Sequence, residues 1–185
     1  MTDPIAERNK EIALAIWGRD IGADVDPDGE EFAEHFRKYH TEDYWNRASE
    51  PGKDRGFENA KMVRRAFQLL FTDAKFEIES AVAEGDMVVL RGTFTAYNTG
   101  GSLFGIPATG RFVSQPHVHF LRFRDGKICE HSVVRDDFPM WQQMTEDDRE
   151  AGIVRFAEQS RTAADEQSRA AADGQSRAAA GAEEG

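Results

Sequence analysis

The chain has little of three things that would place it in a specialised class: cysteine, long apolar runs and positive charge. Its single cysteine, Cys129, cannot form an internal disulfide, and no apolar run is long enough to cross a membrane. The amino terminus is not of the signal type, so we expect a cytoplasmic protein without a membrane partner. The 34 acidic residues outnumber the 23 lysines and arginines, which argues against a nucleic-acid surface. A neutral or mildly polar small molecule is compatible as a ligand.

Motifs of two large enzyme classes are also missing. No glycine-rich phosphate loop follows a strand, and there is no Gly-x-Ser-x-Gly nucleophile elbow. Cys129 lies in a predicted strand without the sequence signature of a catalytic thiol. Nucleotide chemistry and acyl-enzyme chemistry are therefore disfavoured.

The 185 residues divide into a core and a tail. From Glu158 an eight-residue unit with the core Gln-Ser-Arg recurs three times. Eight residues advance about 80° beyond two helical turns, so the repeat produces no fixed apolar stripe. We expect residues 1–145 to form one α+β domain and residues 146–185 to be a frayed helix or a disordered tail.

The core begins with helical patterns and continues with strands. Apolar spacing predicts helices over 7–17, 30–40 and 58–71, the second starting at the turn Asp26-Pro27-Asp28-Gly29. A period of two then predicts strands from Phe76 onward, over 87–97, 111–124 and 127–135, with tight turns at Gly85 and at Asp125-Gly126. Helices followed by strands indicate an α+β fold with an antiparallel sheet. A strongly curved sheet, closed by the helices on its concave side, would enclose a site for a small ligand.

Several segments together resemble one family. They are Thr99-Gly100, the run 104–111, His119, Asp125-Gly126-Lys127-Ile128, Glu130-His131, Asp136 and Gln142-Gln143. This combination resembles the SnoaL-like polyketide cyclases, members of the cone-shaped nuclear-transport-factor-2-like superfamily. The resemblance implies an intramolecular aldol ring closure of an apolar carbonyl compound, without metal or organic cofactor. It also fits a homo-oligomer, a dimer or tetramer, formed through the outer face of the sheet.

Asp136 matches the catalytic aspartate of the resembling family, because it lies six residues before Gln142. A carboxylate suits the reaction, since ring closure removes a proton from a carbon between two carbonyl groups and then protonates an alkoxide. In an apolar pocket, with Trp141 and Leu121 as walls, desolvation would raise the pKa of that carboxyl group. Asp137 is then the outward neighbour. The alternative is that Asp136 only caps the helix predicted from Phe138.

Two histidines share one face of the strand 111–124. His119 matches the strand histidine of the family, whose role is to bind a substrate carbonyl or to position the aspartate. His117 stands where the family usually has a small residue and would shrink or polarise the site; both can also be structural. With His131 or Asp136 the pair could suggest a metal site, but His131 has the opposite strand parity from Asp136, so we expect none.

Further residues complete the predicted ligand contacts. Asn46, Asn98 and Gln115 are candidate polar positioners, although each could equally satisfy backbone groups. Trp45 and Trp141 could form an aromatic wall for a planar substrate, or belong to the core.

The sequence thus predicts a cofactor-independent cyclase or a related acid/base enzyme. An isomerase, a dehydratase or an epoxide hydrolase could use the same scaffold, since one fold hosts many functions. A ligand-binding protein without catalysis would keep the pocket and not need the base.

Overall fold

The computed structural model describes residues 3–17, 25–49, 52–103 and 105–145. The chain divides into two units, residues 1–144 and 145–185, and all but Thr145 of the second lies outside the described residues. The expectation of a frayed or disordered tail therefore stays a prediction. None of the described helices has the length and apolarity to span a bilayer.

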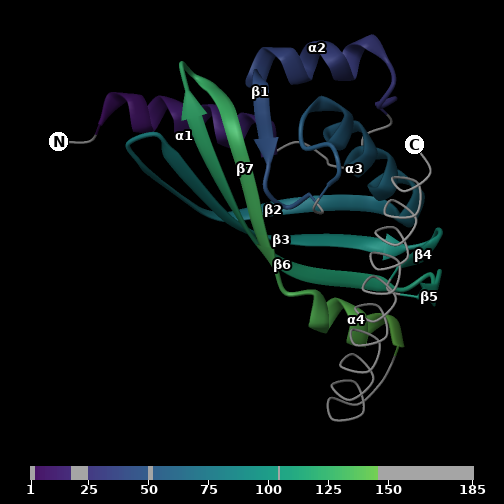
Figure 1. Cartoon of the computed structure of the whole chain (residues 1–185). Coiled ribbons are helices and arrows are strands. Elements are labelled where there is room, and N and C mark those ends of the chain that lie inside the picture. Colours follow the sequence, from purple (N-terminus) through teal and green to yellow (C-terminus); the bar gives the residue numbers. More distant parts are fainter. Residues whose placement is uncertain (1–2, 18–24, 50–51, 104, 146–185) are drawn as a thin grey trace, which may run out of the picture. The chain divides into compact units, whose positions relative to one another are not determined.

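The first unit contains four helices and seven strands among its described residues (Figure 1). The helices are α1 (Pro4–Trp17), α2 (Glu30–Tyr39), α3 (Phe57–Leu70) and α4 (Asp137–Thr145). The strands of the large sheet are β1 (His40–Asn46), β2 (Phe71–Glu84), β3 (Met87–Asn98), β6 (Phe112–Arg124) and β7 (Lys127–Arg135). A small hairpin, β4 (Ser102–Leu103) with β5 (Ile106–Pro107), interrupts the connection from β3 to β6.

The large sheet has the order β1-β7-β6-β3-β2. Three of its four pairings are antiparallel, but β1 runs parallel to β7. The α+β prediction is confirmed, with two differences. The segment His40–Asn46 forms a strand that periodicity did not indicate, and β2 begins at Phe71, directly after α3, rather than near Phe76.

The tight turns have the backbone that their sequences demand. Asp125 and Gly126 both have positive φ, 53° and 75°, as required in the two-residue turn that joins twisted antiparallel strands. Gly85 in the β2–β3 turn also has positive φ. These turns fix the register of the two hairpins, and with it the face to which each side chain points.

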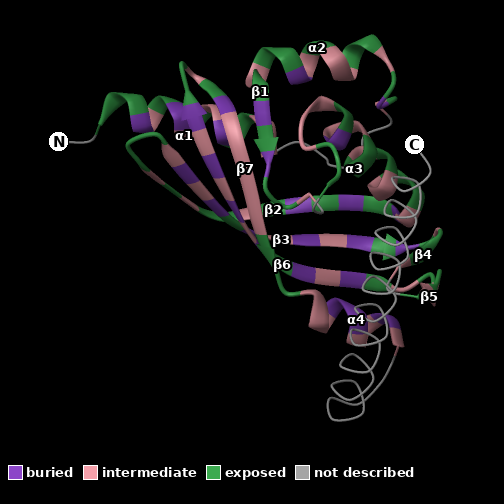
Figure 2. Cartoon of the chain, in the orientation of Figure 1, coloured by how far each residue is buried: buried purple, intermediate pink, exposed green. Residues whose placement is uncertain are grey.

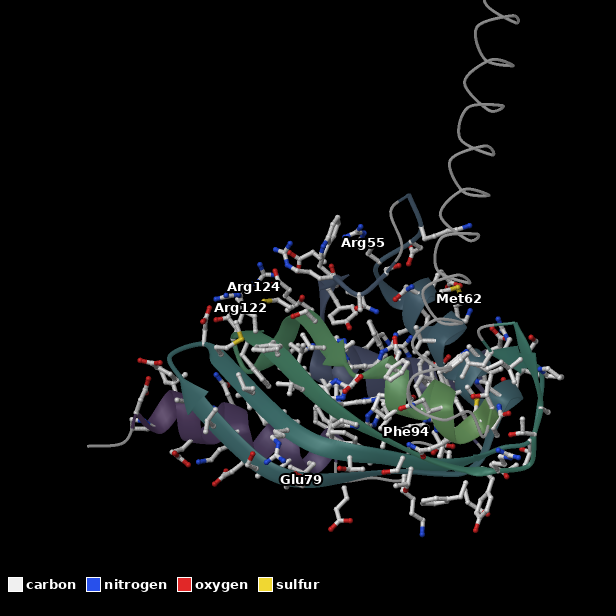
Figure 3. All side chains as sticks on the ribbon, turned by 90° about the horizontal axis from the view of Figure 1, so that it is seen from below. Arg55, Met62, Glu79, Phe94, Arg122 and Arg124 are labelled. Atoms are coloured by element: carbon white, nitrogen blue, oxygen red, sulfur yellow. The ribbon has the colours of Figure 1, made fainter. Side chains whose placement is uncertain are left out.

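Two apolar clusters occupy one face of the sheet. Along β3 and β6, buried residues alternate with more exposed ones (Figure 2). Figure 3 shows Phe94 on the concave side of the sheet and Glu79 on the opposite side. One cluster includes Ala13 of α1, Phe36 of α2 and Leu121 of β6. The second includes Phe94 and residues of α4, with Phe67 of α3 packed against it. The helices thus close the concave face, and burial of these side chains stabilises the domain.

Candidate active site

A β-bulge in β7 decides which side chains reach the concave face. Ile128 pairs with Phe123, and Glu130 pairs with the preceding residue Arg122, so Cys129 is an extra residue in β7. An extra residue reverses the in-and-out alternation beyond it. His131 consequently lies opposite the inward-facing Leu121. His131 and Asp136 thus have opposite parity, as predicted from the sequence, but it is His131 that faces inward, while Asp136 is exposed.

The two aspartates that follow β7 lie differently from the prediction. Asp136 is exposed, and its backbone N–H donates to the carbonyl of Pro116 at 3.3 Å. Asp137 is partly buried, and its Oδ1 accepts a hydrogen bond from the side-chain amide of Gln115. The expectation that Asp136 faces into a desolvated pocket while Asp137 faces outward is thus corrected. Whether either aspartate is catalytic stays a prediction.

Gln115 links Asp137 to His117. A carboxylate can only accept, so the Gln115 amide presents its NH₂ to Asp137 and turns its Oε1 toward His117. That oxygen lies 2.7 Å from Nε2 of His117, so this nitrogen carries the proton and Nδ1 of His117 has the lone pair. Asp137 thereby sets the tautomer of His117 through one amide. Gln115 and His117 are only 2% and 4% exposed.

His119, two residues further along β6, contacts a second imidazole. Its Nδ1 lies 3.0 Å from Nε2 of His131, and the two ring planes are 15° apart with centroids separated by 5.2 Å. Trp17 lies 5.6 Å from both rings, and Phe76 meets His119 edge-on at 5.0 Å. Nε2 of His119 is buried and has no hydrogen-bond partner among the described residues.

Burial keeps these imidazoles neutral. Desolvation lowers the pKa of His117 and of His131 to about 4, and that of His119 to about 2. The neighbouring histidines and Arg135 lower the pKa of His119 further, because each would repel a charged ring. At neutral pH each ring therefore has one N–H and one lone pair, the form that can accept a proton.

Gly92 makes room for the rings. It lies opposite His117 in the β3–β6 pairing, where a Cβ atom would come within 2.2 Å of the Glu77 carbonyl oxygen and 2.7 Å of the Phe76 ring. Any larger residue would displace the β2 backbone or Phe76. Glycine thus permits Phe76 to pack against His117 and His119.

Asn46 and Asn98 are buried, but hydrogen bonds within the protein already occupy their amides. Asn46 donates to Asn59 at 2.6 Å and accepts from the Ala48 N–H at 3.0 Å. Asn98 accepts from the backbone and side chain of Thr109 at 3.0 and 3.2 Å. These bonds order loops, as the alternative interpretation of the sequence held. Ligand contact by either residue stays untested.

The two tryptophans predicted to form an aromatic wall lie in different environments. Trp45 is 46% exposed, and the Arg55 guanidinium lies 5.0 Å from its ring centroid. Trp45 is thus separated from the histidines, because its neighbours Tyr44 and Asn46 occupy the buried face of β1. Trp141 is fully buried in α4 and stacks on Phe138.

No group of three or more potential ligands arranged to hold a metal ion occurs within the described parts of the chain. His119 and His131 approach each other, and Asp136, which has the opposite parity from His131, is exposed and not with them. The expected absence of metal stays a prediction. His131 and Asp137, which the sequence prediction did not place at the site, both follow the extra residue Cys129.

Comparison with known proteins assigns the chain to a family. A family model described as SnoaL-like polyketide cyclase matches residues 30–144. No protein of curated function matches the chain.

Solved structures share the fold. TsrD from Streptomyces laurentii superposes with a TM-score of 0.59 at 23% identity, covering 78% of this chain and 98% of its own. A candidate SnoaL-like polyketide cyclase from Jannaschia sp. CCS1 gives a TM-score of 0.64 at 21% identity, with 80% and 99% covered. AclR from Streptomyces galilaeus, a candidate hydroxylase, gives 0.59 at 25% identity, with 77% and 99% covered. The neighbours carry different names, one a candidate cyclase and another a candidate hydroxylase, so the shared fold alone does not assign the reaction.

Proposed function

Because this chain belongs to the SnoaL-like polyketide cyclase family, we propose that it is an acid/base enzyme that closes a ring in an apolar carbonyl compound by an intramolecular aldol reaction. One observation carries the proposal. Gln115, His117 and His119 form a buried polar row between two apolar clusters, and this row ends in Nε2 of His119, which has no partner in the described part of the chain. A buried polar atom without a partner costs free energy, which a ligand group could recover.

The proposed reaction needs two proton transfers. A base removes a proton from carbon between two carbonyl groups, and an acid then protonates the new alkoxide. Neutral imidazoles and an aspartate supply such groups, so the proposed chemistry requires neither a metal nor an organic cofactor. His119 contacts the carbonyl or the acidic C–H of the ligand, and the apolar clusters beside it receive the hydrocarbon part.

Two aspartates are candidates for a part in the proton transfers. The family resemblance assigns this part to Asp136, whereas the contacts favour Asp137, which reaches the polar row through Gln115. We propose that Asp137 takes part through Gln115, by orienting the imidazoles that transfer the protons, because it bonds this amide whereas Asp136 is exposed.

Deuterium exchange tests the reaction without knowledge of the natural substrate. We would incubate the protein with an aromatic β-keto ester in D₂O and follow the C–H between the carbonyls by proton NMR. Wild-type protein should accelerate exchange, and Asp137→Asn should slow the accelerated exchange at least ~100-fold. Asp136→Asn is the matched control and should exchange at nearly the wild-type rate.

If Asp136→Asn slows the exchange and Asp137→Asn does not, Asp136 is the aspartate that takes part in the proton transfers. If wild-type protein accelerates exchange of no such ester, although the ester binds, a ligand-binding function replaces the enzyme. Extensive dialysis against a chelator, followed by elemental analysis, tests metal independence in the same assay. Loss of exchange together with loss of a stoichiometric metal would refute metal independence.

The homo-oligomer is a separate proposal. Tyr97 and Phe112 pair across β3 and β6 on the outer face of the sheet, where they are 42% and 53% exposed, and Val134 of β7 is 63% exposed. Exposed apolar side chains on one sheet face favour association with a second copy. Light scattering should report a dimer or larger species. Phe112→Glu should shift it to monomer, and Phe112→Leu should not.

A further inference from the structure

The contact between His119 and His131 gives the two rings different roles. We propose that His131 is a positioning residue: it holds His119 in the tautomer with the proton on Nδ1, so that Nε2 presents a lone pair to the ligand. The inference rests on the proposed function for its consequence in turnover, but the tautomer can be measured independently.

The hydrogen bond admits only two arrangements of protons. Either His119 Nδ1–H donates to His131 Nε2, or His131 Nε2–H donates to His119 Nδ1. In the second arrangement His119 would carry its proton on Nε2, and a buried N–H would have no acceptor among the described residues. Unpaired buried N–H groups are rarer in proteins than unpaired acceptors. The first arrangement is therefore favoured, and it makes Nε2 of His119 a base.

The surroundings of the pair keep both rings neutral at rest. The groups that act on His119 electrostatically are His131, His117 and Arg135, and those that act on His131 are His40 and Arg135. All of them, together with burial, disfavour the cationic form. Trp17 and Phe76 pack against the rings and limit their rotation.

A neutral pair can take up and return one proton. When Nε2 of His119 removes a proton from the ligand carbon, the Nδ1 proton of His119 moves to Nε2 of His131. The positive charge then lies on His131, and His119 is neutral with an Nε2–H that can protonate the alkoxide. When it does so, the shared proton returns to Nδ1. No atom or electron is gained or lost, and His131 acts without contact to the ligand. It holds the tautomer of its partner imidazole as the aspartate of a hydrolase triad does, but unlike that aspartate it takes up the shared proton.

Nitrogen NMR of protein labelled with ¹⁵N-histidine tests the tautomer directly at pH 7.5. The Nδ1 of His119 should give the shift of a protonated nitrogen, and Nε2 that of an unprotonated one. His131→Phe should move His119 toward the Nε2–H tautomer that free histidine prefers. His131→Gln, whose amide oxygen can accept from Nδ1, should restore the original pattern. Glu130→Gln, a change on the outer side of β7, is the matched control and should leave His119 unaltered.

An Nε2–H tautomer of His119 in the wild-type protein would overturn the proposal, and so would an unaltered tautomer in folded His131→Phe. If His131→Phe does not fold, the wild-type spectrum and His131→Gln decide.

Turnover supplies the second readout. In the deuterium-exchange assay, His131→Phe should lower kcat at least ~10-fold with little change in KM, because ligand contacts are intact while the base is misoriented. His131→Gln should recover part of the loss. A raised KM at unchanged kcat would contradict positioning. If no ester exchanges with any variant, the proposed function fails, while the NMR spectra still decide the role of His131.

Discussion

Two groups of buried polar side chains can be compared in this fold. Asn46 and Asn98 sit at the ends of strands, and both groups of each amide bond to the protein. The row Gln115, His117 and His119 lies in the middle of β6, and Nε2 of His119 has no partner among the described residues. Burial of polar side chains thus differs between the two groups: the amides are satisfied by loops, whereas the row leaves one polar atom without a partner among the described residues.

Lowering the pH should decrease the free energy of unfolding through the buried histidines and not through the buried amides. The pKa values of His40, His117 and His131 fall to about 4 and that of His119 to about 2, mainly because burial disfavours the charged rings. Between pH 6.5 and about 4 the unfolded chain binds more protons than the folded one, so the free energy of unfolding should decrease as the pH falls. Each buried histidine contributes up to about 1.4 kcal/mol per pH unit.

Urea unfolding at pH 7.5, 6.5, 5.5 and 5.0 measures this loss. The carboxylates with lowered pKa, such as Asp28, Asp43 and Glu130, lose their contribution only at lower pH, so they do not obscure the window. A free energy of unfolding that stays constant from pH 7.5 to 5.0 would show that the histidines are not buried as neutral rings.

Asn98→Ala should be the most damaging single substitution in this comparison. The change removes an amide that is 0% exposed and leaves the Thr109 N–H without its acceptor. We expect a loss of roughly 3 kcal/mol, from unpaired polar groups and the small cavity together. Chemical denaturation at pH 7.5 measures it, and a loss below roughly 1 kcal/mol would show that water replaces the amide.

Gln143→Leu should have an intermediate effect. The side-chain amide of Gln143 accepts from the Ser114 N–H at 2.7 Å and donates to the Ser114 carbonyl at 2.9 Å, which joins α4 to β6. Loss of both bonds should cost about 2 kcal/mol. Thermal melting compared with Gln143→Glu separates the two bonds, because a carboxylate accepts but cannot donate. Equal melting temperatures for Gln143→Leu and wild type would contradict the role of this amide.

His119→Phe should change stability least. Removing a buried nitrogen that has no partner among the described residues should stabilise the fold, whereas leaving Nε2 of His131 without its present partner should destabilise it. The two effects on the free energy of unfolding nearly cancel. We expect a change within about 1 kcal/mol at pH 7.5, together with a weaker dependence of stability on pH. A loss as large as that of Asn98→Ala would mean that His119 is structural, as its alternative interpretation holds.

The sequence predicted the elements of this fold better than the directions of its side chains. The turns at Gly85 and Asp125-Gly126 are encoded locally, so the hairpins could be placed to within a few residues. The strand His40–Asn46 could not, because it pairs in parallel with β7, some ninety residues later in the chain, and carries no alternating pattern of its own. Non-local pairing leaves little local signal.

The site was predicted in part for a similar reason. Gln115, His117 and His119 precede any irregularity in β6, and strict alternation placed them on one face, where the structure has them. Beyond Cys129 the alternation shifts by one residue. The sequence prediction placed Asp136 inward from its spacing to Gln142, whereas beyond the bulge His131 faces inward and Asp136 is exposed. A bulge depends on the pairing of two strands, so the composition of β7 alone does not reveal it.

The bonds between Gln143 and Ser114 also bear on association between chains. β7 pairs with β6 only from His117 onward, so residues 112–116 would otherwise present an open strand edge. Gln143 occupies both backbone groups of Ser114, the Asp136 N–H occupies the Pro116 carbonyl, and Pro116 itself has no N–H to offer. Open edges recruit strands from other molecules. A helix side chain and a proline here take the place of a neighbouring strand, and a chain without Gln143 would be prone to edge-to-edge aggregation even while its fold persists.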